Sequence, residues 1–319
     1  MLCIIVPLFF IVVNLSYKKS RTLVAFLRVF QYNGGMKCTL CPNACGVDRE
    51  KKVGACGEKG VRLAKYGLHF YEEPPISHKN GSGAVFFTGC SLKCVFCQNY
   101  ELSRSLRGKV FTPEELAGVF RELEEMGAEN INLVNPTHAV DSLIKAFSIY
   151  RPSIPVVYNT HGYERVETLE KIDPFVDIYL PDMKFFAPEV SKRYTGKADY
   201  FAVAKKALSF MAKKPCVLRE DDKMLSGVIV RHLVLPMNLP DTRAILRHLK
   251  ETLPQTAYLS VMAQYTPFGE IDRFPELQRP LTKREYERVT CEVESLAFPR
   301  LFLQERASSS ESFIPDWDY

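Results

Sequence analysis

Residues 84–97 read AVFFTGCSLKCVFC, an apolar run followed at once by three closely spaced cysteines. The run Ala84–Thr88 predicts a β-strand, so Cys90, Cys94 and Cys97 would lie on the loop that leaves the carboxyl end of that strand. Three thiolates on one loop can bind three irons of a cubane iron–sulfur cluster, a type of cluster that usually has four cysteine ligands. The spacing therefore predicts a cluster with one iron that has no protein ligand.

A second cysteine group precedes this loop. It comprises Cys38, Cys41, Cys45 and Cys56, in a loop-like segment that contains several glycines. Four thiols with one wide gap suit a structural zinc ion or a second iron–sulfur cluster, and the sequence leaves the choice between these metals open. Seven of the ten cysteines fall between residues 38 and 97, and this clustering favours metal binding in a reducing compartment over disulfides. A cytoplasmic location is therefore expected.

The first 35 residues form an extension that differs from the rest of the chain. An apolar stretch, Leu2–Val13, is interrupted by Pro7 and is followed by basic residues. It is too short to span a bilayer, and its charges lie on the wrong side of the apolar run for a secretory signal. We interpret residues 1–35 as a spurious upstream start, because Met36 stands just before Cys38. Organelle targeting, or anchoring at a membrane surface, is the alternative.

The composition is that of an ordinary folded protein. The chain has 319 residues, of which 46% are hydrophobic, and its formal net charge is +5. Four of the basic residues precede Met36, and without them 38 Lys and Arg face 37 Asp and Glu. This near balance gives no reason to expect a nucleic-acid partner.

From residue 84 onward, strand-like apolar runs alternate with amphipathic helical segments. The runs are Ala84–Thr88, Asn130–Asn135, Ile154–Tyr158, Val176–Leu180, Val228–Leu235 and Tyr258–Met262, with Leu301–Gln304 as an additional candidate. Such alternation predicts a parallel sheet with right-handed crossovers. We expect an α/β fold, a partial (β/α)6 barrel at residues 76–319 with a C-terminal tail, preceded by a small cysteine-rich module at residues 36–75.

Helix starts are marked by capping sequences. Thr112 and Glu115 form a capping box around Pro113 and predict a helix to about Met126. Thr282 with Glu285 predicts the start of the last long helix in the same way. A further helix is expected to open at Asp241 and Thr242.

Polar residues follow the predicted strands at their carboxyl ends. Barrel-like α/β folds gather their chemistry at this edge of the sheet, so these side chains and the cysteine loop would share one rim. The polar groups of interest are Asn159 and Thr160, Asp182 and Lys184, and Gln264. Arg231 and His232 are adjacent in a predicted strand and therefore point to opposite faces, so only one of them can enter the barrel.

The three-cysteine loop, with the aromatic Phe96 before the last cysteine, resembles the signature of radical S-adenosylmethionine (SAM) enzymes. Further segments resemble one branch of that superfamily, the group related to pyruvate formate-lyase activating enzyme. These segments are Cys97–Tyr100, Tyr179–Lys184, Arg231–Pro236, Met262–Pro267 and Phe313–Trp317. The resemblance extends from Met36 to Tyr319.

This resemblance implies a radical SAM enzyme of the activating-enzyme type, an oxidoreductase. Its [4Fe–4S] cluster would sit on Cys90, Cys94 and Cys97, and the open iron would chelate SAM. One electron would cleave SAM to methionine and a 5′-deoxyadenosyl radical that abstracts hydrogen. The radical would form in an enclosed pocket. Reduced flavodoxin or ferredoxin is the implied electron donor.

Six residues are candidates for binding SAM or the substrate. Asp182 and Lys184 match an Asp-x-Lys pattern that contacts SAM in activating enzymes. Asn159, Thr160 and Gln264 can hydrogen-bond the nucleoside or the substrate, and Phe96 is expected to pack near adenine. Activating enzymes also carry a Gly-Gly-Glu-like segment for the SAM amino group, where this chain has Asn135-Pro136-Thr137, so Asn135, Thr137 or main-chain carbonyls would have to replace it.

Neither the motifs nor the resemblance identifies the substrate. A protein substrate is the first hypothesis, and a small molecule or cofactor is the alternative within the same class of enzyme. A non-catalytic zinc-binding, iron–sulfur or electron-transfer protein is the alternative from another class.

Overall fold

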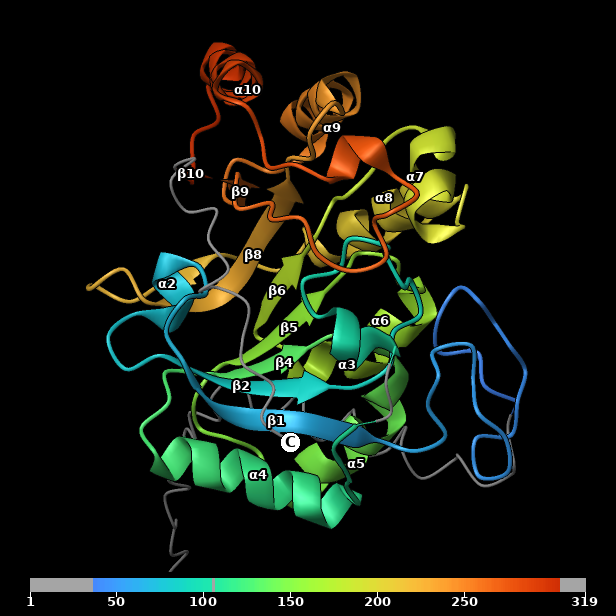
Figure 1. The fold of residues 1–319 in the computed structure, drawn as a ribbon. Coiled ribbons are helices and arrows are strands. Elements are labelled where there is room, and N and C mark those ends of the chain that lie inside the picture. Colours follow the sequence, from blue (N-terminus) through green and yellow to red (C-terminus); the bar gives the residue numbers. More distant parts are fainter. Residues whose placement is uncertain (1–36, 105–106, 305–319) are drawn as a thin grey trace, which may run out of the picture. The chain divides into compact units, whose positions relative to one another are not determined.

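The computed structural model describes residues 37–104 and 107–304, and these residues form a mixed α/β fold around one large sheet (Figure 1). The strand order is β10-β9-β8-β6-β5-β4-β2-β1-β3. Neighbouring strands from β2 to β10 run parallel. They are β2 (Ser82–Phe87), β4 (Ile131–Val134), β5 (Val156–Thr160), β6 (Ile178–Pro181), β8 (Met224–Leu233), β9 (Tyr258–Met262) and β10 (Leu301–Leu303). The sheet curves into an unclosed barrel, which confirms the predicted fold class.

All six predicted strands and the additional candidate at residues 301–304 are present. Three further strands were not predicted, and all of them pair antiparallel: β1 (Arg62–His69), β3 (Lys109–Val110) and β7 (Val217–Leu218). β1 lies inside the predicted module at residues 36–75 and pairs with β2, so the sheet begins before residue 76. The sequence pattern does not predict β1, because polar and apolar residues are mixed along this strand. Only one of its residues is fully buried.

The longer helices that connect the strands lie on the outer side of the sheet (Figure 1). The longer ones are α4 (Pro113–Glu125), α5 (Val140–Ile149), α6 (Val166–Ile172), α7 (Pro188–Thr195), α8 (Tyr200–Met211), α9 (Leu239–Thr252) and α10 (Lys283–Leu296). The short helices are α2 (Pro74–Ser77) and α3 (Tyr100–Arg104), and the 3-10 turns are η1 (Thr137–Ala139), η2 (Asp173–Phe175) and η3 (Pro275–Leu277).

Capping explains where several helices begin. Both predicted capping boxes are formed, at the starts of α4 and α10. The predicted start of α9 is wrong by two residues, because Asn238 is the N-cap and Asp241 lies in the first turn. The carboxylate of Asp241 instead accepts hydrogen bonds from the backbone amides of Phe186 and Ala187, and so joins the segment after β6 to α9.

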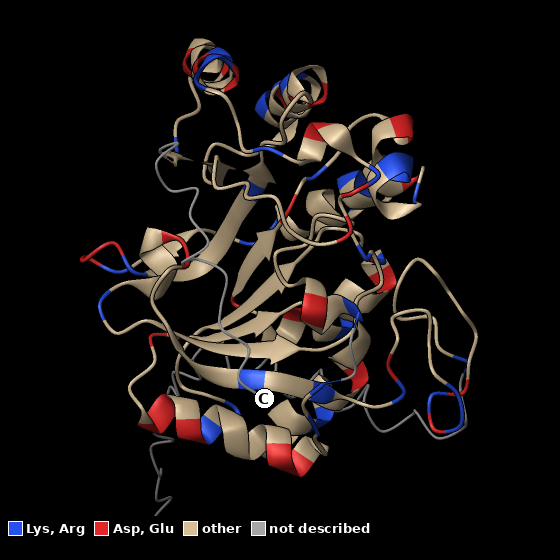
Figure 2. Cartoon of the chain, in the orientation of Figure 1, with Lys and Arg blue, Asp and Glu red and all other residues tan. Residues whose placement is uncertain are grey.

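The core lies between the central strands and the helices. Every residue of β5 and β6 is buried, as expected for parallel strands that are covered on both faces. Figure 2 shows both charge signs on α4, α9 and α10, whereas β4, β5 and β6 contain no charged residue. The charged side chains inside the barrel therefore come from strand ends and from the loops beside them.

Some predictions fall on residues outside this description. Residues 1–35, interpreted from sequence as a non-native start or a targeting segment, and the segment Phe313–Trp317 lie outside the described ranges. No helix within residues 37–104 and 107–304 is long and apolar enough to cross a membrane.

Candidate active site

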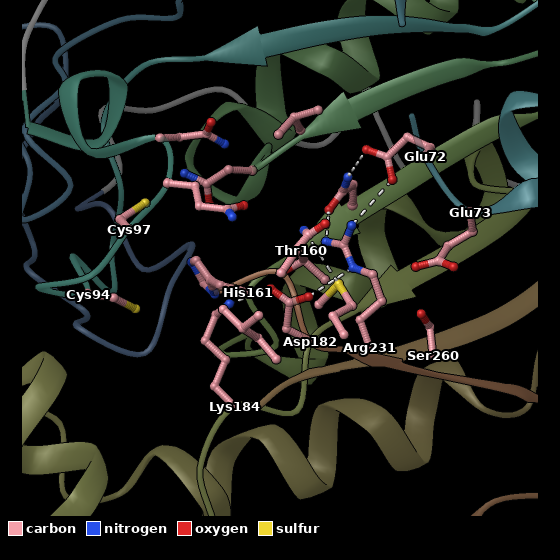
Figure 3. Close-up of a pocket in the computed structure, with 18 of the residues that line it drawn as sticks. Glu72, Glu73, Cys94, Cys97, Thr160, His161, Asp182, Lys184, Arg231 and Ser260 are labelled. Carbon is pink, nitrogen blue, oxygen red and sulfur yellow. Dashed lines mark hydrogen bonds and ion pairs between the residues drawn. The ribbon is translucent and has the colours of Figure 1, made fainter. Parts of the chain in front are cut away.

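A cavity of about 600 Å³ opens at the carboxyl ends of the parallel strands and extends into the barrel. Nine residues predicted from sequence to bind the cluster, SAM or substrate line it together. They are Cys90, Cys94, Phe96, Cys97, Asn159, Thr160, Asp182, Lys184 and Gln264. Figure 3 shows Cys94 and Cys97 on one side of the cavity, Glu72, Glu73 and Ser260 on the opposite side, and Thr160, His161, Asp182 and Lys184 between them.

The three cysteines lie on the loop after β2. Cys90 and Cys94 are buried and Cys97 is partly buried. The backbone amides of Leu92 and Lys93 point to the sulfur of Cys90, at N–Sγ distances of 3.4 and 3.5 Å. Burial raises the pKa of the Cys94 thiol and raises that of Cys97 to about 11. A bound cation would stabilise these thiolates, which burial alone disfavours.

Hydrogen bonds from several elements hold the cysteine loop in place. The ring Nε2 of His161 lies 2.9 Å from Ser91 Oγ, and Asn43 Nδ2 donates to the carbonyl of Ser91 at 2.8 Å. The Tyr163 amide donates to Nδ1 of His161 at 3.1 Å, so in the neutral ring Nε2 carries the hydrogen that points to Ser91. Burial, with a contribution from the nearby Lys184 ammonium, lowers the pKa of His161 to about 3. His161 is therefore a neutral positioning residue.

Asp182 is the centre of a buried charged network. Its Oδ2 lies 2.6 Å from Lys184 Nζ, and its Oδ1 accepts from Arg231 Nε at 2.9 Å. The two other guanidinium nitrogens of Arg231 bind Glu72 Oε2 at 3.3 Å and Asn159 Oδ1 at 2.6 Å. Asn159 Nδ2 in turn donates to Glu72 Oε1 at 3.1 Å. The network joins the ends of β5, β6 and β8 to the segment before α2.

The network fixes the protonation states of its members. Burial alone would raise the pKa of Asp182, but Arg231 and Lys184 hold it below its usual range. Burial opposes the charge on Lys184 and on Arg231, yet the Asp182 carboxylate raises the pKa of each above its usual value. Asp182 is thus an anion between two cations at neutral pH.

Thr160 contributes less to the cavity than the sequence suggests. Its hydroxyl donates to Glu164 Oε1, and the same oxygen accepts from Thr137 Oγ1 at 2.6 Å. Glu164 is buried, which raises its pKa to about 7 even though these two hydroxyls stabilise its anion. Thr160 therefore faces the cavity with a hydroxyl that already has an acceptor.

Phe96 and Gln264 lie at the cysteine side and the β9 side of the cavity. The ring of Phe96 packs edge-to-face against Phe185, Tyr194 and Tyr265, with centroid separations of 5.8–6.3 Å. Gln264 accepts from Gln304 Nε2 at 2.8 Å. Phe96 is therefore a rigid wall, and Gln264 is held by the segment after β10.

Asn135 stands where the sequence departs from the activating-enzyme pattern. Its backbone is left-handed, with φ of 59°, and its Nδ2 donates to the carbonyl of Gly89 at 2.8 Å. Its Oδ1 is buried and has no hydrogen-bond partner among the described residues. The side chain lines the cavity next to the cysteine loop.

Two histidines near the carboxyl ends of the strands, His138 and His232, are not part of the cavity. His138 does not line it, and burial, together with Arg49, lowers the pKa of His138 to about 3. His232 is buried on the other face of β8 from Arg231, where its nitrogens lie 2.8 Å from the Met183 carbonyl and 3.0 Å from Thr242 Oγ1. Of the adjacent pair in this strand, Arg231 enters the cavity.

Sequence reasoning missed Glu72, Glu73 and Ser260. The two glutamates stand before Pro74-Pro75, in a segment assigned to the cysteine-rich module, and no strand pattern linked them to the barrel. Ser260 was read as part of an apolar strand. Successive side chains of a strand point to opposite faces, so this alternation in β8 and β9 could have indicated that Ser260 shares a face with Arg231. The two residues are register partners.

The cysteine group at residues 38–56 contacts the barrel through its loop backbone. The carbonyl of Cys56 accepts from the amide of Cys90 at 2.9 Å, which joins the two cysteine segments directly. Thr168 Oγ1 donates to the carbonyl of Leu40 at 2.8 Å, and Arg165 donates to that of Thr39 at 3.2 Å. Across the described part of the chain, no three His, Cys, Asp or Glu side chains are close enough to hold a single metal ion.

Comparison with known proteins gives a consistent picture. The sequence model of the Radical SAM superfamily matches residues 84–217. An uncharacterized protein of Methanocaldococcus jannaschii is 32% identical over 261 residues, which cover 79% of this chain and 72% of that protein.

Two solved structures are similar to parts of this chain. A domain of pyruvate-formate lyase-activating enzyme from Bacteroides vulgatus is 12% identical, with 60% of this chain and 91% of that chain covered and a TM-score of 0.36. Streptococcus suis SuiB, solved with the precursor peptide SuiA, is 12% identical, with 68% and 46% covered and a TM-score of 0.47.

The superfamily match begins in β2, spans the cysteine loop and continues through β4, β5 and β6. The Methanocaldococcus jannaschii relative extends the similarity to most of both chains. With the unclosed α/β barrel and the cysteine-lined cavity at its strand ends, these findings show that the chain belongs to the radical SAM superfamily.

Proposed function

We propose that this chain cleaves SAM reductively at a [4Fe–4S] cluster on Cys90, Cys94 and Cys97, and that it abstracts hydrogen from a substrate in the same cavity. Membership of the superfamily supports radical SAM catalysis in general. The observation that favours these particular residues is that all nine predicted side chains line one cavity, with the cysteines at one side of it.

The cysteine loop suits a cluster chemically. Three thiols line one cavity, and two backbone amides point to the sulfur of Cys90. Hydrogen bonds of this kind stabilise thiolate ligands and tune the potential of iron–sulfur clusters. When bound, the cluster and SAM would supply one-electron cleavage of the sulfonium and a 5′-deoxyadenosyl radical.

The protein side chains between the two ends of the cavity suit SAM. Lys184 is a largely buried cation that can bind the SAM carboxylate, and Asp182 is a largely buried anion that can accept from the ribose or the amino group. Asn135 Oδ1 has no hydrogen-bond partner among the described residues, and it would replace the missing Gly-Gly-Glu-like segment as a partner of the amino group. Phe96, Asn159, Thr160 and Gln264 would complete the nucleoside and substrate walls.

Several further assignments belong to this proposal. Cys38, Cys41, Cys45 and Cys56 would bind a second metal, zinc or iron–sulfur, within a module at residues 36–75 that precedes the barrel at 76–319. Residues 1–35 would be dispensable. Reduced flavodoxin or ferredoxin would supply the electron, and a protein, as for activating enzymes, would be the substrate, with a small molecule or cofactor as the alternative.

The test is anaerobic reconstitution of the full chain with iron and sulfide, followed by dithionite and SAM. We expect 5′-deoxyadenosine from the wild type and none from Cys94→Ala. Cys291→Ala is the matched control, because Cys291 is exposed and lies on α10, away from the cavity. A protein that binds only zinc and forms no 5′-deoxyadenosine would instead support the non-catalytic alternative.

A further inference from the structure

The side of the cavity opposite the cysteines has its own polar group. Glu73 precedes α2, and its backbone carbonyl accepts from the amides of Ile76 and Ser77, whereas its side chain makes no capping bond. The carboxylate instead lines the cavity, and the nearby hydroxyl of Ser260 lines it too. Figure 3 shows Glu73 and Ser260 on the far side of Asp182 and Arg231 from Cys94 and Cys97.

The cations of the cavity are already engaged by other groups. All three guanidinium nitrogens of Arg231 are used, by Asp182, Glu72 and Asn159, and Lys184 is bound to Asp182. Glu73 itself forms no ion pair with any described residue. Among the described residues that line this cavity, three carboxylates, from Glu72, Glu73 and Asp182, therefore face two cations, Lys184 and Arg231.

An extra buried carboxylate is costly unless a cation or several donors accompany it. Burial raises the pKa of Glu73 above its usual range, although Arg231 opposes that shift. The hydroxyl of Ser260, on the same side of the cavity, can supply one donor, which would leave further acceptor positions of the carboxylate for a ligand. A positively charged ligand group would remove the cost.

The wall above this carboxylate is apolar. In the register of the sheet, Ser260 lies beside Arg231 on one side and Phe302 on the other. Two residues closer to the carboxyl ends, Leu233 lies beside Met262, and both line the cavity. Leu233 and Met262 therefore give the cavity an apolar wall on the β8 and β9 side.

We propose that the substrate bears a cationic group, an alkylammonium or a guanidinium, on an apolar stem, and that Glu73 and Ser260 bind this group while Leu233, Met262 and Phe302 pack against the stem. This assignment rests on the proposed function, because it places SAM beside the cysteines and leaves the far side to the substrate. The stem then brings a carbon toward the SAM side. A lysine or arginine side chain of a protein and a free alkylamine share this chemistry.

The experiment measures binding of two matched cationic and neutral probe pairs to the reconstituted full-length protein with SAM. One pair is a blocked Gly-Lys-Gly peptide and its norleucine analogue, and the other is n-pentylamine and n-pentanol. We expect the cationic member of at least one pair to bind at least tenfold more tightly than its neutral partner. A preference in the peptide pair alone identifies a protein side chain, and one in the amine pair identifies a free amine.

Glu73→Gln should reduce this preference at least tenfold, whereas Glu251→Gln, at an exposed position of α9, should leave it unchanged. Equal affinities within both pairs, failure of all four probes to bind, or an unchanged preference in Glu73→Gln would overturn the inference. Formation of 5′-deoxyadenosine without any probe is measured in parallel. Its presence in the wild type separates failure of this inference from failure of the proposed function.

Discussion

Arg231 Nε donates to Asp182 Oδ1 at 2.9 Å, although the two residues are 49 positions apart in the chain. The bond joins the end of β6 to β8, strands that pair through only two register positions, and a further isolated bridge links the same two residues. Because Asp182 also binds Lys184 and Arg231 also binds Glu72, this contact connects the proposed SAM side of the cavity to the proposed substrate side.

Removal of the guanidinium should destabilise the fold strongly. Arg231→Met would leave the carboxylates of Asp182 and Glu72 buried without it, and loss of one partner of a buried ion pair typically costs roughly 3–5 kcal/mol. Urea unfolding monitored by circular dichroism measures this cost. Arg219→Met, which breaks an exposed pair with Asp221, is the control and should unfold like the wild type. Equal unfolding midpoints for the two variants would contradict the prediction.

Neutralisation of Asp182 should weaken SAM binding. Asp182→Asn keeps the size of the side chain but removes the charge that holds Lys184 and that would accept from SAM. Hydrogen bonds to charged groups are worth about 1.5–3 kcal/mol, so the SAM dissociation constant should rise about 10-fold to 100-fold. Calorimetric titration of the reconstituted protein measures this constant, with Cys291→Ala as the control. An unchanged constant would remove Asp182 from the proposed SAM site.

Asn135 allows the backbone and side-chain roles of one residue to be separated. Its left-handed backbone, with φ of 59°, suits Gly better than Ala, so Asn135→Gly should be more stable than Asn135→Ala by about 1 kcal/mol. Both variants lose Oδ1, and both should lose SAM affinity. Thermal unfolding and SAM titration are read on the same samples. Wild-type SAM affinity in both variants would show that Oδ1 is not a ligand of the amino group.

His232 should make stability depend on pH. Burial lowers its pKa to about 4, although the Met183 carbonyl favours the charged ring, whereas the unfolded chain titrates near 6.5. Between these values the unfolded state binds the proton, so the contribution to stability is full above about pH 6.5 and is lost as the pH falls toward 4. His232→Asn should lower the slope of the unfolding free energy in this window by up to about 1.4 kcal/mol per pH unit. The unfolding free energies of the wild type and His232→Asn are measured by urea unfolding at pH 4.5–6.5. Equal slopes of these free energies against pH would contradict the prediction.

The cysteine group at residues 38–56 should account for a second metal. Cys45→Ala should lower the metal content of the purified protein. Cys216→Ala should not, because Cys216 is a half-buried cysteine just before β7 and outside this group. The cluster loop should persist in Cys45→Ala, because the bond from the Cys90 amide to the Cys56 carbonyl uses backbone atoms only. Elemental analysis gives zinc and iron separately. Identical metal content in wild type and Cys45→Ala would remove this group as a metal site.

The sequence by itself determined the features that depend on local pattern. The cysteine spacing, the parallel strands and the two capping boxes each follow from residues that are near one another in the chain, where period and propensity act directly. The alternation of strands and helices then placed Asp182, Asn159 and Gln264 at one rim, because parallel strands end on the same edge of a sheet. These residues line the cavity that the structure contains.

Only the tertiary structure decided what shares the cavity with them. The antiparallel pairing of β1 with β2 brings Glu72 and Glu73 into the barrel, and neither strand periodicity nor a motif encodes that pairing. The register of β8 against β9 sets Ser260 beside Arg231, and the contacts between strands determine which carboxylates the guanidinium neutralises. Charge balance in a buried site depends on groups distant in sequence, so only the folded chain shows that Glu73 has no ion-pair partner among the described residues.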